Sequence, residues 1–521
     1  MARSKTSVTE RSISGSDFLQ LDVSGAPARG RADWLTEQIR AAIGDGRLSV
    51  GSRLPATRVL ADELRLARGV VTEAYRRLIE DGQVAGYGRA GTIVVAVPAA
   101  APDGHADAGT QSPPSPEELF APRPSSEVFD LMRAVPARID LSPGVPDLAA
   151  FPRSAWLRAE RSVLADVETS DLGYGDPGGA LPLRRAVATW LARNRGVNAA
   201  PEEIIVVAGV AQSLALLARV LRGDGITQVA VEDPGSLGTR QQLQAWQVTT
   251  PPVPVDAAGI RVDELSASAA PAVLLTPAHQ FPTGVVLDGA RRRELMQWVD
   301  EGGLIIEDDY DAEHRYDRPP VPALRALRVD RILYTGSVSK LLSPALRIGW
   351  LLPPPAYREA VVAAKRDADL GNAVLPQLVL AELMRSGALE SHLRLTRARH
   401  RRRRDAMLHA VHNYLPHAQI HGAAAGLHLM LTLDTRITDV ELAAAALARG
   451  VKVHPLSWHS QRAIRPGLVL GYAARTPDEI TEGAATVAKL LRRTTARSQP
   501  KTRPSPAFAH GARLRRNSNS R

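Results

Sequence analysis

The sequence predicts an α/β protein in two parts, a small module of short helices with a β-hairpin and a large, mostly parallel sheet flanked by helices. Amphipathic helical stretches fill residues 31–81, a stretch rich in proline, alanine and glycine covers residues 98–124, and short β-branched runs alternate with helical segments after it. We therefore expect five segments: a disordered tail at 1–30, the small module at 31–97, a linker at 98–130, the large domain at 131–493 and a basic disordered tail at 494–521.

Composition narrows the class of protein. With 521 residues, 44% of them hydrophobic, the chain can bury a sizeable core and form two or three domains. It contains no cysteine, which excludes disulfide frameworks and cysteine nucleophiles, and no metal site is predicted. No apolar signal segment opens the chain and no run reaches the roughly 18 apolar residues of a membrane span, so we expect a cytoplasmic protein. The net charge of +10 favours a polyanionic partner.

The small module has the spacing of a helix-turn-helix. Two amphipathic helices are predicted at 58–64 and 68–81, joined by a turn of three or four residues, and two strand-like runs around a glycine-rich turn follow in the pattern of a wing. In such modules the second helix enters the major groove of DNA, where Arg68 at its start can bind guanine. Three further arginines are placed to meet backbone phosphates: Arg58, Arg76 and Arg89. The alternative is a three-helix interaction domain whose arginines are only solvated.

Residues 35–94 resemble the winged helix-turn-helix of GntR-type bacterial transcription regulators along almost their whole length. The resemblance implies DNA contacts at the turn, at the start of the recognition helix and at the wing, from Arg58, Arg68, Gly69, Val70, Gly88 and Arg89. The chain departs from the family where Ala67 and Val70 replace a usual serine and threonine. Two usual hydrogen bonds are therefore lost, and the DNA half-site cannot be carried over from the family.

The large domain contains short apolar runs that end in glycine, aspartate or serine. They read EEIIVVAG, TQVAVEDPG, PAVLLTPAH, GGLIIEDDYD and RILYTGSVSK, with helical stretches between them. This alternation is typical of a mostly parallel sheet covered by helices. Ligands bind such sheets beyond the carboxyl ends of the strands, which is where the polar residues of these runs fall.

Groups that can hold a phosphate gather at two of those strand ends. The run GVAQSLALLARVL opens a helix directly after a strand, so backbone amides near Ala211 and Gln212 can bind an anion. Ser337, Ser339 and Arg347 flank Lys340 and supply hydroxyl and guanidinium donors. Each feature alone is more often a plain helix start or a surface turn, but their combination favours an anion site.

The remaining groups fit a pyridine ring that carries an aldehyde. Lys340 is a primary amine that can form a Schiff base, which an arginine cannot do. In IIEDDYD, one carboxylate of Asp308 and Asp309 can pair with a protonated ring nitrogen, and the phenol of Tyr310 can reach a ring hydroxyl. Taken singly, the lysine could cap a turn and the carboxylates could satisfy a strand end. Together these groups predict pyridoxal 5′-phosphate as the cofactor.

From about residue 139 to 491 the chain looks like a fold-type I, aspartate-aminotransferase-like domain, through the ordered motifs YGDPGGALPLRRAVATWL, EDPG, TPAHQFPTG, IIEDDYDAEHRYD and TGSVSKLLSPALRIGWL. Joined to a GntR-type head, it resembles the MocR group of bacterial regulators, which includes the GabR and PdxR types. The resemblance implies Lys340 for the covalent link, Asp308 for the ring nitrogen, Tyr310 for the ring oxygen, Arg347, Ser337, Ala211 and Gln212 for the phosphate, and His279 and Gln280 beside the ring. Tyr174 looks like the tyrosine that reaches the phosphate of the neighbouring subunit, which implies an antiparallel homodimer.

Three positions depart from this family pattern. Phe281 stands where many aminotransferases have an asparagine, and Ser236 where an aromatic residue usually stacks on the ring, which predicts lower cofactor affinity. Trp458 stands where GabR-like members carry an arginine for the effector's carboxylate. A neutral indole offers one donor and no charge, so a GABA-like effector is not expected, and the cofactor itself or an amine is the expected signal.

Function remains open between classes of protein at this point. The first hypothesis is a transcription regulator whose aminotransferase-like domain senses pyridoxal phosphate or an amine and controls operator binding, without sustained turnover. The second is a working aminotransferase with an appended DNA-binding domain, and the third is a constitutive DNA-binding protein with an inactive sensor. We favour the first because the head has a complete DNA-reading architecture.

The run HLRLTRARHRRRRDAML, residues 392–408, permits two interpretations. It is expected to be a solvated helix between the large and small parts of the domain. On a dimer it could instead touch phosphates of flanking DNA, with a salt-dependent effect on affinity.

Overall fold

The structure is a computed structural model, and it describes residues 30–88, 91–95, 115–316 and 321–497, together with residues 19, 21, 26 and 27. Contacts divide the chain into two compact units, Met1–Ser112 and Pro113–Arg521, and each is described by itself. Arg89 and nearly all of both predicted tails lie outside the described residues. Within the described part of the chain, no helix is both long and apolar enough to cross a membrane.

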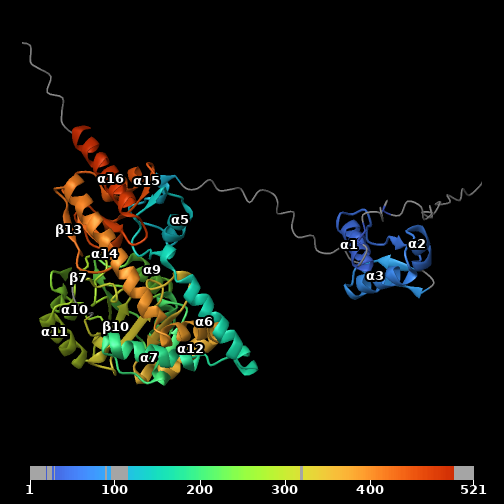
Figure 1. Cartoon of the computed structure of the whole chain (residues 1–521), viewed down its shortest axis with the longest axis horizontal. Helices are drawn as coiled ribbons and strands as arrows, with labels where there is room; N and C mark the ends of the chain where they lie inside the picture. Colours follow the sequence, from blue (N-terminus) through green and yellow to red (C-terminus); the bar gives the residue numbers. More distant parts are fainter. Residues whose placement is uncertain are drawn as a thin grey trace, which may run out of the picture. The chain divides into compact units, whose positions relative to one another are not determined.

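Within its described residues, the small unit consists of three helices and a three-stranded sheet (Figure 1). Its elements are α1 (Arg31–Gly44), β1 (Arg53–Leu54), α2 (Thr57–Glu63), α3 (Arg68–Glu80), β2 (Val84–Gly86) and β3 (Thr92–Val94), with sheet order β1-β3-β2. Leu35, Leu60 and Leu78, one from each helix, are fully buried in a single core. The two predicted helices and the wing are therefore found, with boundaries within one residue for the helices.

The large unit is built on an eight-stranded sheet in the order β5-β12-β11-β10-β9-β6-β7-β8. The strands are β5 (Ile205–Val207), β6 (Val229–Asp233), β7 (Pro252–Asp256), β8 (Gly259–Ile260), β9 (Ala272–Leu275), β10 (Leu304–Asp309), β11 (Ile332–Ser337) and β12 (Gly349–Leu352). Pairing is parallel from β11 through β10, β9 and β6 to β7, whereas β12 and β8 run antiparallel to their neighbours. The mostly parallel sheet is thus confirmed.

Helices cover both faces of this sheet. They are α6 (Arg153–Asp166), α7 (Leu181–Arg195), α8 (Val210–Gly223), α9 (Leu237–Ala245), α10 (Val262–Ala267), α11 (Gly289–Asp300), α12 (Pro355–Asp369) and α13 (Val374–Arg385). Alternate residues of each strand enter opposite layers, so Ile306 packs with α8 and α12 and Ile305 packs with α10 and α11. Both faces are apolar, and the sheet is buried between two helical layers.

A smaller C-terminal lobe completes the large unit. It contains β4 (Ile139–Asp140), α14 (Ala388–Tyr414), β13 (Gln419–His421), β14 (His428–Thr432), α15 (Asp439–Leu447), β15 (Val451–Lys452), β16 (His454–Pro455), β17 (Gly467–Gly471) and α16 (Pro477–Arg497). Figure 1 shows α14 running from the body of the large sheet into this lobe, beside α16.

The chain joins this lobe earlier than the predicted linker boundary at 130. Helices α4 (Pro116–Leu119) and α5 (Val128–Ala134) lie within the predicted linker or overlap its end. Phe120 is 3% exposed and Met132 is also 3% exposed, both in the core of the C-terminal lobe. The prediction is wrong from residue 119 on, because a few widely spaced apolar side chains dock there although the local composition is that of a linker.

Candidate functional site

The site lies where the carboxyl ends of three strands meet. In the β10–β11 register, Asp308 pairs with Thr335 and Asp309 with Gly336. Gly349, the first residue of β12, pairs with both Ser337 at the end of β11 and Val207 at the end of β5. Segments 207–212, 308–311, 337–340 and 347–349 therefore converge at one edge of the sheet.

The two carboxylates at the end of β10 have different surroundings. Asp309 points into the layer of α7, where its carboxylate accepts from Arg195 Nε at 2.5 Å and from the hydroxyl of Tyr334. Asp308 follows Ile306 on the opposite face, beside α8, and its Oδ1 is buried with no hydrogen-bond partner among the described residues. The Asp309 carboxylate thus has its hydrogen-bond partners inside the fold, and Asp308 is the carboxylate that remains available to a ligand.

The surroundings of Asp308 also disfavour its charge. Burial, followed by the nearby carboxylates of Asp309 and Asp311, raises the pKa of Asp308 to about 7, and the ammonium of Lys340 acts in the opposite direction. A protonated ring nitrogen placed against Asp308 would supply the missing donor and cation together. The residues present therefore fit a pyridinium ring.

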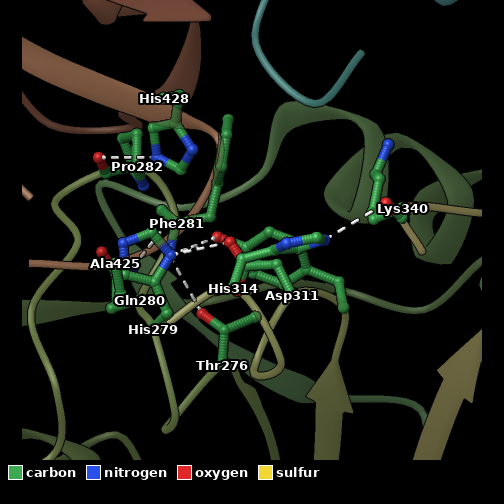
Figure 2. Close-up of polar contacts among 12 residues, drawn as sticks. Thr276, His279, Gln280, Phe281, Pro282, Asp311, His314, Lys340, Ala425 and His428 are labelled. Carbon is green, nitrogen blue, oxygen red and sulfur yellow. Dashed lines mark hydrogen bonds and ion pairs between the residues drawn. The ribbon is translucent and has the colours of Figure 1, made fainter. Parts of the chain in front are cut away.

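Lys340 lies in the turn after β11, and its ammonium donates to the carbonyl oxygen of Gly144. Shielding from water lowers the pKa of Lys340, while Asp311 and Asp308 raise it. The Nε2 atom of His314 lies 3.2 Å from the Lys340 carbonyl oxygen and holds the backbone of this turn (Figure 2). A lysine with a lowered pKa is a better nucleophile toward an aldehyde.

A cradle that could hold an anion lies at the start of α8. Gly209 has a φ of 81°, and a Cβ added there would lie 3.3 Å from a guanidinium nitrogen of Arg347. The Arg347 guanidinium also donates to the carbonyl oxygen of Ala208. The amides of the first helical turn, including that of Ala211, have no intrahelical acceptor four residues back and are directed out of the helix end. Ser337, at the end of β11, is 6% exposed.

Gln212 is already engaged within the chain. Its Oε1 accepts from the Ala208 amide at 2.7 Å, and its Nε2 donates to Asp369 at 2.7 Å. Its own amide donates to the Gly209 carbonyl oxygen at 3.1 Å. Gln212 thus shapes the cradle from within, and Asp369 is a partner that the sequence alone did not reveal, since it lies in α12.

His279 and Gln280 occupy the loop after β9. His279 Nδ1 lies 2.8 Å from Asp311 Oδ2 (Figure 2). It also lies 3.1 Å from the Tyr310 hydroxyl, so the three side chains form one group. Gln280 is 1% exposed and its amide nitrogen donates to the carbonyl oxygens of Pro234 and Phe281. Gln280 therefore holds two loops together, and its amide nitrogen is not left for a ligand.

The three family departures have separate explanations in the structure. Ser236 caps α9, with its hydroxyl oxygen accepting from the Thr239 amide at 3.2 Å. Phe281 meets the Tyr310 ring edge-on, with centroids 6.3 Å apart and an interplanar angle of 83°. Trp458 is 1% exposed, and its ring stacks on that of Phe120 with the ring centroids 5.3 Å apart. Its indole N–H donates to the backbone of the segment that follows Phe120.

Trp458 therefore does not present its indole N–H to a ligand. Its only N–H is bonded at 3.0 Å to the Ala121 carbonyl oxygen, inside the core of the C-terminal lobe. No signal close to Trp458 in the sequence indicates this contact, because its partner lies in the misassigned linker.

The arginine-rich run lies on α14, between the two lobes of the large unit, and combines exposed arginines with arginines that are half-buried or buried. In α14, Arg399 and Arg403 both pair with Asp147, which is buried. Other members donate to backbone oxygens: Arg397 to Glu313, Arg401 to Tyr316, Arg403 to Ala473 and Arg404 to Ala423. These contacts join α14 to both lobes of the large unit.

Tyr174 projects into solvent. Its side chain is 94% exposed, on the loop between α6 and α7. Leu157, Leu164 and Leu172 on the preceding segment are 50%, 54% and 60% exposed. This edge of the large unit therefore presents apolar side chains to water.

In the small unit, the predicted DNA contacts lie mainly at the N-terminus of α3 and in the helix-turn-helix segment before it. Arg58 and Arg68 are exposed, and neither side chain has a hydrogen bond or ion pair within the described part of the chain. Ala67 is the N-cap of α3 and makes no side-chain cap, as its methyl group dictates. Gly69 is exposed, Val70 is half-buried, and Gly88 at the wing has a φ of 56°.

Arg76 differs from the other arginines of the small unit. It forms ion pairs with Glu73 and Glu80 on the same helix, α3. These carboxylates offset its charge, so Arg76 is a weaker candidate for a phosphate contact than Arg58.

Comparison with known proteins agrees with this architecture. Residues 137–487 match the family model "Aminotransferase class I and II", and residues 32–94 match "Bacterial regulatory proteins, gntR family". The large unit is similar to a solved kynurenine aminotransferase from Pyrococcus horikoshii, with a TM-score of 0.65 and 26% identity over 70% of this chain and 93% of that one. The fold and site thus define a GntR-type DNA-binding head joined to an aminotransferase-like domain.

Relatives match the chain in both parts. It is 31% identical to the "Probable rhizopine catabolism regulatory protein MocR" of Rhizobium meliloti, over 86% of this chain and 91% of that protein. It is 34% identical to the "HTH-type pyridoxine biosynthesis transcriptional regulator PdxR" of Corynebacterium glutamicum, over 86% and 92%. The chain belongs to the MocR group of GntR-type transcription regulators. It is a DNA-binding regulator whose aminotransferase-like domain binds pyridoxal 5′-phosphate.

Proposed function

We propose that this regulator controls its binding to operator DNA through a pyridoxal phosphate site built on Lys340, and that pyridoxal phosphate, or an amine exchanging with Lys340, is the effector. One observation carries the proposal. The buried Oδ1 of Asp308 has no hydrogen-bond partner among the described residues, and the Asp308 carboxylate lies close enough to Lys340 for the two charges to interact. Such a carboxylate is costly to bury alone, and a cationic ring nitrogen would compensate it.

The residues that would hold the cofactor follow from this geometry. When bound, pyridoxal phosphate supplies an aldehyde that links to a primary amine and a ring nitrogen that takes up a proton. Lys340 would hold the aldehyde, Asp308 the ring nitrogen and Tyr310 the ring oxygen, with His279 behind Tyr310. The phosphate would be held by Arg347, Ser337 and the amide of Ala211. The Gln212 amide, which was expected to contribute, is bonded to the Gly209 carbonyl oxygen instead.

The head would read DNA through the start of α3. Arg68 is free to reach a base edge, and Arg58 a phosphate, with Gly69 and Val70 allowing close approach of the backbone and Gly88 forming the wing turn. Arg89, assigned to DNA contact by resemblance, lies outside the described residues. Because its target is DNA, we infer a cytoplasmic location.

We further infer a homodimer joined at the edge formed by α6 and the loop after it. The exposed leucines there and the fully projecting Tyr174 support a second copy of this chain as the partner, since contiguous exposed apolar side chains mark interaction sites. Tyr174 would then reach the phosphate of the neighbouring subunit. A ligand that binds two arrangements of such a dimer with different affinity shifts the spacing of the two heads.

The effector assignment draws on two points. Trp458 is unable to act as a carboxylate clamp, and the relative from Corynebacterium glutamicum is named for pyridoxine biosynthesis. Both favour the cofactor itself over an amino acid as the signal.

The test is an absorbance spectrum of the purified full chain with pyridoxal phosphate, before and after borohydride reduction, followed by mass-spectrometric location of the modified residue. We expect a visible band that reduction abolishes and a modification on Lys340, and none in a Lys340→Ala variant. Lys489→Ala, which removes an exposed lysine on α16, is the matched control. Pyridoxal phosphate should also change the affinity for an operator fragment. A modification elsewhere, or unchanged operator affinity, contradicts the proposal.

The same samples separate the regulator from a working enzyme. Steady turnover with an amino donor and a 2-oxo acid acceptor would identify an aminotransferase, whereas a spectral change without turnover fits a sensor.

A further inference from the structure

The arginines of the helix-turn-helix, which spans α2, the turn and α3, fall into two sets. Arg76 and Arg77, in the second half of α3, form ion pairs with carboxylates of α1 and α3. The others are exposed, and no side-chain hydrogen bond or ion pair engages them within the described part of the chain: Arg58, Arg65 and Arg68. Positive charge without a carboxylate partner therefore lies at the two helix starts and in the turn between the helices.

Arg65 ends α2 in the left-handed backbone conformation. Its φ is 50°, and its amide donates to the Asp62 carbonyl oxygen at 3.3 Å. The next amide, that of Leu66, donates to the Ala61 carbonyl oxygen at 2.9 Å. These are the two hydrogen bonds of a Schellman motif, whose left-handed position is usually a glycine. An arginine there brings its Cβ close to the following carbonyl oxygen, which costs stability.

The other helices of the small unit end on glycine, as far as the structure describes the unit. Gly46 follows the cap residue of α1 with a φ of 83°, and Gly82 follows that of α3 with a φ of 69°. The turn at Gly82 has the same two bonds, from Gly82 to the Ile79 carbonyl oxygen and from Gln83 to that of Leu78. Arg65 is therefore the exception in a unit that otherwise uses glycine for such a helix end.

Arg65 gains no contact within the small unit that would compensate this cost. Asp62 and Glu63 are the nearest carboxylates along the chain, and neither forms an ion pair with Arg65 among the described residues. Oε2 of Glu63 is itself buried there without a hydrogen-bond partner. A strained residue without an internal contact indicates a role outside the fold, and a free guanidinium indicates an anionic partner.

We propose that Arg65 binds a DNA phosphate from the turn of the helix-turn-helix, in addition to the arginines assigned above. This inference rests on the proposed function, because it takes α3 as the helix that enters the major groove. The helix before the recognition helix then crosses the DNA backbone, so the turn between them lies beside phosphates. A guanidinium binds a phosphate through charge-assisted hydrogen bonds, and such a contact positions the protein without reading the bases.

The decisive variant is Arg65→Gly in the full chain, because it should act in opposite directions on the fold and on DNA binding. Glycine relieves the left-handed position, so the amides of α2 should exchange with deuterium about twofold to fivefold more slowly. Loss of the guanidinium should weaken binding to a labelled 30-base-pair duplex of arbitrary sequence about threefold to tenfold. The slope of log affinity against log salt concentration should fall by about 0.9 for each bound head.

Two variants control for charge. Arg65→Lys keeps the cation in the same strained turn, so the salt slope should match that of the wild type. Arg47→Ala removes an equal charge from an exposed arginine that is paired with Asp45, and it should leave both the slope and the affinity unchanged. Fluorescence anisotropy between 50 and 200 mM salt measures binding, and mass spectrometry of the full chain measures the deuterium exchange.

The outcomes separate this inference from the proposed function. An unchanged salt slope in Arg65→Gly, or faster exchange of α2 in that variant, overturns the role of Arg65 alone. Equal losses in Arg65→Gly and Arg47→Ala also overturn it, because they would reflect net charge. If Arg65→Gly does not fold, Arg65→Asn takes its place, since asparagine also tolerates the left-handed conformation. Wild-type operator affinity that pyridoxal phosphate leaves unchanged refutes the proposed control by the cofactor and leaves the Arg65 result standing.

Discussion

Replacing Asp308 with asparagine removes a buried charge while keeping the shape of the side chain, and it should have opposite effects on the free and the cofactor-bound protein. Among the residues that the structure describes, Oδ1 of this carboxylate has no hydrogen-bond partner, and burial raises the pKa of Asp308 from the usual 3.8 to about 7. The folded protein therefore resists ionisation of Asp308, whereas the unfolded chain does not.

The sign of the pH dependence follows directly. Because the folded pKa is the higher one, the contribution of Asp308 to stability is present below pH 3.8 and is lost as the pH rises toward 7. Between pH 5 and pH 8 this loss amounts to about 2–3 kcal/mol, since each unit of pKa difference corresponds to about 1.4 kcal/mol. Asparagine does not titrate, so the cofactor-free Asp308→Asn protein should gain that amount over the wild type across this range.

The cofactor-bound protein should respond in the other direction. A hydrogen bond to a charged group contributes about 1.5–3 kcal/mol, so losing the carboxylate should weaken pyridoxal phosphate binding about 10-fold to 150-fold. Urea unfolding of the cofactor-free proteins at pH 5 and pH 8, followed by tryptophan fluorescence, measures the first effect, and absorbance titration measures the second. Asp300→Asn is the control for both. Parallel stability profiles of Asp308→Asn and the wild type between these pH values would refute the reasoning.

Three other predictions concern separate parts of the molecule. Arg68→Ala should weaken binding to the operator by about 1–3 kcal/mol and relax the sequence preference. Arg58→Ala should weaken binding to all DNA sequences alike and reduce the slope of log affinity against log salt concentration by about one. Fluorescence anisotropy at several salt concentrations measures both effects. Leu164→Glu should convert the proposed dimer to a monomer in sedimentation at micromolar concentration, and an unchanged sedimentation coefficient contradicts the proposed edge. Trp458→Ala should lower the free energy of unfolding of the large unit by about 3–5 kcal/mol in urea, with Trp246→Ala, a 43% exposed residue, as a milder control.

The helix starts and strand ends could be predicted because local chemistry specifies them. Helix α3 begins at Arg68 as expected, and the strands of the large sheet end near the glycines, aspartates and serines that mark them. Since parallel strands place their carboxyl ends at one edge, the approximate position of the site followed from the same pattern. The geometric convergence of the Lys340 and Asp308 segments is therefore a consequence of strand order alone.

The choice between Asp308 and Asp309 came from the family resemblance and could not be made from the strand pattern alone. In a half-exposed strand, the alternation of polar and apolar residues shows which side chains share a face. Strand β10 is buried along its whole length, so its sequence shows no such alternation. Which aspartate faces the site depends on Arg195, which lies in α7 and pairs with Asp309. The same limit applies to Trp458, whose acceptor on Ala121 lies in a segment with the composition of a linker.

The arginines of α14 show why a charge run in a sequence does not specify a surface. An arginine side chain has five N–H donors and a long apolar stem. It can therefore extend from a helix into the protein, where carbonyl oxygens accept its hydrogen bonds. Arg403 is 8% exposed and is held by Asp147 and by the Ala473 carbonyl oxygen, and the Arg404 guanidinium lies 4.8 Å from the centre of the Tyr316 ring. Its neighbours in the run bond to oxygens of both lobes, so the charge serves to join the two halves of the sensor domain.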